Sequence, residues 1–421
     1  MGILEYALVG AVVVLFLIVI WARKDGTVIL SFLVGASAGL VSVQLWRVHV
    51  FTIVVLVWTL YRGGSFHHRK LVGVALLAVP VGLLALTSLL GDLVNSPTLA
   101  LQLIALALSA SAIVVFSSPD DRRQMLFGLL SMASLGSIVA LLQVSKIIPS
   151  DLWHISVSAL GRPTGIYPEP DWLGMFAGIG AVLAWRLSLR PWMRMFLVTL
   201  NASVFVLAFA RAAWIAVGVS IAVVLVLTYV FSRRTSRNNS KGRKRSLLGL
   251  LVAALVVLVA SPQLVSDLST RLDNTFVVSS NDISAQARVR QFNALFVLAE
   301  NSPFYGHGLS ASGKVTVWGD IDLGETDNNV ASNWVLAMWV DGRWLAIPMI
   351  VFLVLLAAAS ARTISGQGLI IVLLSSLFSN ATFFSVMWLL IGLCISERMA
   401  LGPKPALTSV VHRQAPVILS S

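Results

Sequence analysis

Arginines placed among apolar residues are the features of this sequence best suited to chemistry. Arg211 lies in the phrase AFARAAW, inside the mostly apolar stretch from Trp192 to Phe231. A guanidinium at membrane depth is costly unless it lies at an interface, faces a cavity or binds an anion. Arg162, Arg288 and Arg290 belong to other segments that we expect on the same side of a membrane. Because the guanidinium fork matches phosphate oxygens, this group predicts an anion-binding site.

The alternative for each arginine is that it snorkels to the surface or pairs with a nearby acid such as Glu169 or Asp171. Both acids lie in GRPTGIYPEPDWLG, which is dense in proline and glycine. Such residues impose turns, so we expect no continuous helix between Arg162 and Asp171 but a shaped loop that leads into a span.

A second turn-rich element, SPFYGHG, carries His307. An imidazole titrates near neutral pH, so His307 is a candidate general base. The alternative is a structural histidine. The glycines around it allow positive φ or close backbone approach.

Other catalytic chemistry finds no support in the sequence. The phosphate-binding phrase GxxxxGK[ST], the zinc motif HExxH, the nucleophile motif GxSxG and metal-spaced clusters are all missing. Cys394 is the only cysteine, which excludes a disulfide within the chain. We therefore expect neither a metal nor an organic cofactor.

The composition predicts how these residues are positioned. Charged residues make up 11% of the chain and hydrophobic ones 57%, so most of it must be dissolved in lipid. Apolar runs recur from Leu4 to Ile395. We expect an all-α, polytopic integral membrane helical bundle of about twelve or thirteen spans with one large outer loop. The run from Leu369 to Phe378 is short for a full span and predicts a broken or re-entrant helix.

The net charge of +12 has two explanations. Nucleic-acid binding is one, but retention of Lys and Arg in cytoplasmic loops is commoner in membrane proteins. The basic connections alternate along the chain, and the strongest of them, within residues 232–246, holds seven bases and no acid. We expect this loop and the C-terminus in the cytoplasm, contact of the loop with anionic membrane lipids, and no nucleic-acid partner.

The alternation places the long segment 261–330 outside the cytoplasm. It is acidic overall and too long for a simple connection. Within it, Ile283 to Asn301 has helical spacing of apolar residues, so we expect an amphipathic helix against the membrane surface or the bundle.

The expected organisation has five parts. They are N-terminal transmembrane helices in 1–145, central transmembrane helices with the arginine loop and the basic loop in 146–260, the large extracytoplasmic loop in 261–330, C-terminal transmembrane helices in 331–402 and a cytoplasmic tail in 403–421.

From Arg162 to Ile395, the order of the outer elements resembles the O-antigen ligase and polysaccharide polymerase superfamily of bacterial membrane glycosyltransferases. RPTGIYPEPDWLG is similar to the arginine loop of that family, and AFARAAWIAV to its arginine at a helix start. VRQFNALFVLAENSPFYGHGLS resembles the family pattern of an arginine, an amphipathic stretch and a GxG turn. NNVASNWVLAMWVDGRWLAIPMIVFL resembles the family segment that closes the long loop and re-enters the membrane.

The resemblance implies a multi-pass protein of the bacterial cytoplasmic membrane that transfers a glycan from a polyprenyl-diphosphate carrier to an acceptor glycan or lipid on the outer side. An acceptor hydroxyl attacks the anomeric carbon and the lipid diphosphate leaves. Arg162, Arg211 and Arg290, with Arg288 as the alternative to Arg290, are then expected to stabilise the diphosphate.

The ligases of that family have a histidine where this chain has Ala331, Ser332 and Asn333. If the acceptor hydroxyl must be deprotonated, Asp327, Glu325 or His307 would be the base, and spacing does not separate them.

Two other functions stay open. A transporter or flippase of lipid-linked glycans would be expected to show internal repeats and charges at mid-membrane, which this sequence lacks. A non-catalytic scaffold for envelope assembly would fit the missing histidine.

Overall fold

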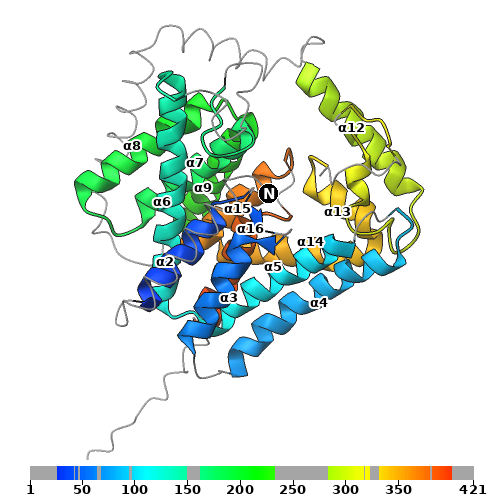
Figure 1. Cartoon of the computed structure of the whole chain (residues 1–421), viewed down its shortest axis with the longest axis horizontal. Helices are drawn as coiled ribbons and strands as arrows, with labels where there is room; N and C mark the ends of the chain where they lie inside the picture. The colour runs from blue at the N-terminus through cyan, green and yellow to red at the C-terminus, as the bar shows by residue number, and fades with distance from the viewer. Residues whose placement is uncertain are drawn as a thin grey trace, which may run out of the picture.

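The computed structural model describes ten stretches of the chain: 26–41, 43–45, 48–63, 68–93, 97–148, 162–232, 283–316, 318–322, 331–379 and 382–400. These residues are mostly helical, with very little strand (Figure 1). The α-helices are α2 Gly26–Ala38, α3 Val50–Arg62, α4 His68–Leu90, α5 Pro97–Phe116, α6 Pro119–Val144, α7 Pro170–Arg186, α8 Pro191–Leu207, α9 Arg211–Ser232, α12 Ile283–Glu300, α13 Trp334–Gly342, α14 Ile347–Ser360, α15 Ile364–Ser375 and α16 Ser385–Ala400. The shorter elements are the antiparallel strands β1 Gln44–Leu45 and β2 Val48–His49 and the 3-10 helices η2 Ala311–Lys314 and η3 Arg343–Ala346.

Four helical stretches of the described chain are long and apolar enough to cross a membrane. They are Lys70–Leu90, Leu99–Phe116, Pro119–Val144 and Trp334–Ser360. In the first and the last, only 33% of the most apolar window is buried. Apolar side chains exposed on this scale are unfavourable in water but not in lipid. The prediction of an all-α polytopic membrane protein is therefore confirmed.

The core of the bundle forms around α16. Every residue of this helix from Ser385 to Ser396 is buried, so other protein elements enclose that stretch. Trp388 at its centre has no exposed surface and donates from Nε1 to the carbonyl of Thr382 at 2.8 Å. A helix that is apolar on all sides has no preferred lipid or water face, which suits a central position.

Several sequence expectations can be compared with these elements. The helix expected from Ile283 is confirmed as α12, and the short run near Leu369 is α15, a helix of 12 residues. The β1 and β2 hairpin was not predicted, because two-residue strands leave no periodic pattern. The basic loop 232–246 lies outside the described residues except for Ser232, as does the tail from residue 403.

Side-chain contacts sort the connections into two groups. Arg123 donates to Ser188 at 2.7 Å, and Arg186 donates to the carbonyl of Arg362 at 3.0 Å. These contacts join basic connections to one another at the end of α7 that carries Arg186. The connections that we expect outside the cytoplasm meet at its other end, which carries Asp171. This grouping agrees with the alternation of charge, while the side that faces the cytoplasm stays a prediction.

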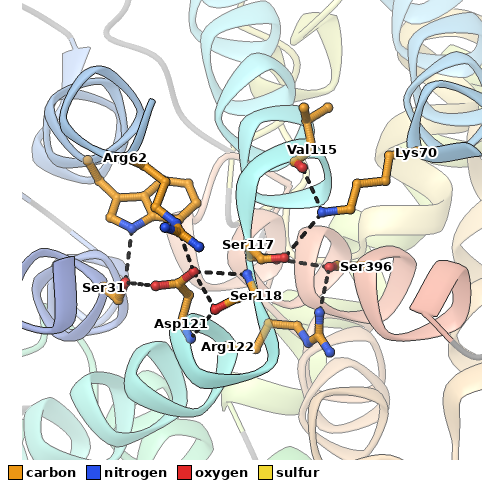
Figure 2. A network of polar contacts seen from close by, with 10 residues as sticks. Ser31, Arg62, Lys70, Val115, Ser117, Ser118, Asp121, Arg122 and Ser396 are labelled. Carbon is orange, nitrogen blue, oxygen red and sulfur yellow. Dashed lines mark hydrogen bonds and ion pairs between the residues drawn. The ribbon is translucent and has the colours of Figure 1, made fainter. Parts of the chain in front are cut away.

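At the end of the bundle where the basic connections lie, a polar network joins α2, α3, α5, α6 and α16 (Figure 2). The Asp121 carboxylate lies at its centre. It accepts from Ser31 Oγ at 2.8 Å and from the amide and hydroxyl of Ser118 at 2.9 and 2.7 Å, and it forms an ion pair with Arg62 at 3.2 Å. The Ser118 hydroxyl also accepts from the Asp121 amide, which completes a capping box at the start of α6.

The same figure shows how α5 and α16 join this network. Lys70 donates to the carbonyls of Val115 and Ser117 at 2.7 and 3.3 Å, where α5 ends. The Ser396 hydroxyl contacts the Ser117 hydroxyl at 2.8 Å and accepts from Arg122 at 3.1 Å. A cation is favourable at a helix C-terminus, so Lys70 stabilises the end of α5.

Replacing Asp121 by Asn should lower the stability of the bundle. The change leaves Arg62 without its counter-charge. We expect a loss on the order of 2 kcal/mol, less than for a fully buried pair because the Arg62 side chain is 34% exposed. Thermal unfolding of the detergent-solubilised chain measures it. Asp120→Asn is the matched control, since Asp120 is exposed in the same helical turn. Equal melting temperatures for the two variants would contradict the role of Asp121.

Candidate functional site

The loop before α7 has the turn-rich form expected from its prolines and glycines. Residues 162–169 are non-helical, and α7 begins at Pro170, directly after Glu169. Proline suits this first helical position because its missing amide would have no partner there. Tyr167 anchors the loop, since its ring stacks on Phe176 with centroids 4.4 Å apart. The expectation of a shaped loop leading into a helix is confirmed.

Gln143, near the end of α6, holds this loop in place. Its Oε1 accepts from the amides of Thr164 and Gly165 at 3.2 and 2.8 Å, and its Nε2 donates to the Gly165 carbonyl at 3.2 Å. Gly165 has φ of 63°, and a Cβ there would lie 2.6 Å from the carbonyl oxygen of Gly136. The position therefore requires glycine for both backbone conformation and space.

Asp171 brings arginines from two distant segments together. Its Oδ1 lies 3.4 Å from Arg162 Nη1, and its Oδ2 lies 3.2 Å from Arg288 Nη2. The side chains of Asp171 and Arg162 are 19% and 17% exposed, and that of Arg288 is 37% exposed. One carboxylate thus bridges the arginine loop and α12.

Arg211 adds a third arginine-bearing segment to this region. It is the first residue of α9, as the expected helix start requires. The turn before it contains Phe209, whose φ is 49° and whose carbonyl accepts from Arg162 Nη1 at 3.3 Å. The starts of α7 and α9 also pack closely, because a Cβ on Gly174 would lie 2.4 Å from the Cβ of Ala210. Two helix N-termini, each with a partial positive charge, therefore meet beside the Arg162 loop.

The structure distinguishes Arg288 from Arg290. The Arg288 guanidinium pairs with Asp171 and lies 5.9 Å from the centroid of the Phe378 ring. Arg290 is exposed, and its backbone lies against Gly319 in the loop after η2. Of the two sequence candidates, Arg288 is the one in contact with the arginine loop.

Glu169 is a second carboxylate at this position. Its backbone caps α7, but its side chain forms no capping bond. Although the side chain reaches the surface, desolvation by the surrounding protein raises the pKa of its carboxyl. The charge of Asp171 also raises this pKa, while Arg288 and Arg162 lower it.

His307 lies at the other end of α12. Its Nε2 is 3.1 Å from the Leu298 carbonyl, its Nδ1 is 2.9 Å from Asp92 Oδ1, and the ring is buried. Leu298 and Arg288 are ten residues apart on α12, which corresponds to roughly 15 Å along the axis. These contacts suit a structural histidine. The expectation that His307 is a base stays a prediction.

The GxG turn around His307 wraps the end of α13. Gly308 donates to the Asp341 carbonyl at 2.9 Å, and the Asp341 carboxylate accepts from the amides of Ser310 and Ser312 at 2.8 and 2.7 Å. Asp341 is buried, so these bonds compensate for its lost hydration. This element fixes the turn after α12 against the C-terminal end of α13.

Glu325 and Asp327, the remaining candidate bases, lie outside the described residues. Within the described residues, no group of three or more His, Cys, Asp or Glu side chains is arranged so that it could hold a metal ion.

Gln143 and Phe378 were not identified from the sequence as parts of this site. Asp171 was named only as an acid with which an arginine could pair, and the structure shows that pairing with Arg162 and also with Arg288. Gln143 gave only the weak signal of an amide in an apolar helix. Phe378 resembled any other apolar residue.

Replacing Gln143 by Leu should release the arginine loop. Two buried amides would lose their acceptor, at a cost of about 1–3 kcal/mol each. We expect faster hydrogen exchange at Thr164 and Gly165, measured by mass spectrometry. Gln124→Leu is the control, because Gln124 lies in the same helix and makes no side-chain hydrogen bond within the described residues. Unchanged exchange in the Gln143 variant would show that other contacts hold the loop.

Part of the chain is similar to a known protein family. Residues 196–342 match the family described as O-antigen ligase. The matched region contains Arg211, Arg288, Arg290 and His307, whereas Arg162 and Asp171 precede it. A search of curated proteins found no match.

Proposed function

We propose that this chain, whose residues 196–342 match the O-antigen ligase family, transfers a glycan from a polyprenyl-diphosphate carrier to an acceptor hydroxyl. The reaction takes place on the outer side of the bacterial cytoplasmic membrane, during assembly of a cell-surface polysaccharide. The acceptor is another glycan or a lipid.

The observation that carries this proposal is the shared contact of Asp171 with Arg162 and Arg288. The two arginines are distant in sequence. Each contacts a different oxygen of the Asp171 carboxylate, so both lie beside the same small anion. A diphosphate offers more charge and more acceptor oxygens than a carboxylate. It suits the same guanidinium donors, since arginine binds phosphate oxygens through a planar fork.

The chemistry requires stabilisation of a leaving group. The acceptor oxygen forms a bond to the anomeric carbon, the bond from that carbon to the phosphate oxygen breaks, and its electron pair leaves with the lipid diphosphate. Donors placed in advance around the developing charge lower the barrier most. Arg162, Arg288 and Arg211 supply positive charge at the start of α7 and α9, where the helix dipoles add to it.

Alanine at Arg162, Arg211 or Arg288 should lower glycan transfer by about 10² to 10³, because each change removes a donor to the leaving group. The chain length of surface polysaccharide in a deletion strain that expresses each variant measures this. Arg186→Ala is the matched control, since Arg186 lies at the far end of α7. Full-length polysaccharide from all three variants would contradict the proposal.

Direct binding separates diphosphate recognition from turnover. Farnesyl diphosphate should raise the melting temperature of the purified full chain more than farnesyl monophosphate does, and Arg162→Lys should reduce the difference. Lysine keeps the charge but lacks the fork. Equal shifts for the two compounds would mean that the site does not select a diphosphate.

The deletion strain also tests the two competing functions. A glycosyltransferase predicts that a lipid-linked glycan accumulates on the outer leaflet. A flippase predicts accumulation on the inner leaflet, and a scaffold predicts that the arginine variants behave like the parent chain.

A further inference from the structure

Two carboxylates border the arginine cluster, and their surroundings differ. Asp171 contacts Arg162 through one oxygen and Arg288 through the other. Both of its oxygens therefore face a guanidinium. Opposite charges at this distance attract each other and hold the carboxylate in place. Asp171 is therefore already committed to two ion pairs.

Glu169 lies two residues earlier, at the cap position of α7. Its side chain is exposed and makes no hydrogen bond or ion pair with the described part of the chain. Its electrostatic partners are Asp171, Arg288 and Arg162, which places the carboxyl beside the proposed diphosphate site. Of the two acids, Glu169 is the one open to an incoming group.

We propose that Glu169 is the general base that accepts the proton of the acceptor hydroxyl. This inference rests on the proposed function and adds to it the residue that activates the acceptor. The assignment follows from a carboxylate that makes no bond to the described residues, reaches the surface and lies beside the arginines that would bind the leaving group.

The step balances as follows. The acceptor oxygen attacks the anomeric carbon while its proton moves to a Glu169 oxygen. The carbon–oxygen bond to the diphosphate breaks, and the electron pair leaves with the diphosphate, which the arginines stabilise. Glu169 then releases the proton to solvent, to which its exposed side chain has access. The reaction consumes no oxidant, reductant or other co-reactant.

The environment of Glu169 suits a base better than that of a free glutamate. Desolvation and the charge of Asp171 raise its pKa, and the opposing Arg288 and Arg162 charges lower it, with a net rise. A stronger base takes the proton more readily, and an efficient base has a pKa near the working pH. Because a base must be deprotonated to act, the rate should fall as the pH falls through this raised pKa.

Two carboxylates in different surroundings commonly take different roles at one site. Here Asp171 positions the arginines and Glu169 moves the proton. His307 has both ring nitrogens within hydrogen-bond distance of Asp92 and Leu298. An acceptor hydroxyl could reach it only after one of those contacts breaks.

The test uses the full chain reconstituted in liposomes, with the glycolipid extracted from the deletion strain as substrate. Glu169→Gln should lower kcat by about 10² to 10⁴ and leave the response to farnesyl diphosphate unchanged. The acidic limb of the pH–rate profile should be lost. In Glu169→Ala, added formate should restore part of the rate by taking the proton instead. Glu300→Gln, an exposed glutamate at the end of α12, is the control.

Three results would overturn the inference: a Glu169→Gln rate within threefold of the parent, loss of farnesyl diphosphate binding in that variant, or no restoration by formate. Failure of the proposed function looks different, because the parent chain itself would then transfer no glycan. A flippase would move the glycolipid between leaflets without extending it, whatever residue stands at position 169.

Discussion

The bridge from Asp171 to Arg162 and Arg288 is the interaction on which the site depends. Like charges repel, and an anion placed between two guanidinium groups offsets that repulsion. Asp171 supplies that anion from the first turn of α7 and thereby connects the arginine loop with α12. Without it, the two arginines would have no common partner among these contacts.

The rest of the bundle makes this arrangement rigid. Gln143 fixes the loop from α6, and the close approach of Gly174 to Ala210 sets α7 against the start of α9. At the other end of α7, the network around Asp121 joins helices from the first and the last parts of the chain. At both ends of α7, hydrogen bonds and ion pairs therefore join segments that are far apart in the chain.

The sequence predicted those parts of the fold that depend on local patterns. Pro170 and the turn-rich phrase before it predicted the start of α7, and Arg211 predicted the start of α9. The spacing from Ile283 located α12. Charge and hydropathy were enough to predict the class of protein, a helical membrane protein.

The tertiary contacts that form the candidate site could not be predicted from local sequence patterns. Asp171 could be recognised as a first-turn acid, but its bridge to Arg288 joins residues 117 positions apart. The choice between Arg288 and Arg290 depends on how α12 is rotated about its axis, and the helix has apolar residues on more than one face. Leu295 and Leu298 are buried, whereas Val289, Phe292 and Phe296 are exposed. Only tertiary packing decides which of two arginines faces the loop.

The attachments of α12 give its two ends different mechanical properties. Arg343 Nη1 donates to the carbonyls of Ala299 and Ser302, and so clamps the C-terminal end. The N-terminal half is held by the partly exposed ion pair of Arg288 with Asp171 and by the hydrogen bonds of Gln291 to the carbonyls of Val315 and Thr316. Surface ion pairs are weak, and a competing anion can replace one partner. An anion that displaced Asp171 from Arg288 would therefore loosen the N-terminal half of α12, while Arg343 keeps its C-terminal end in place.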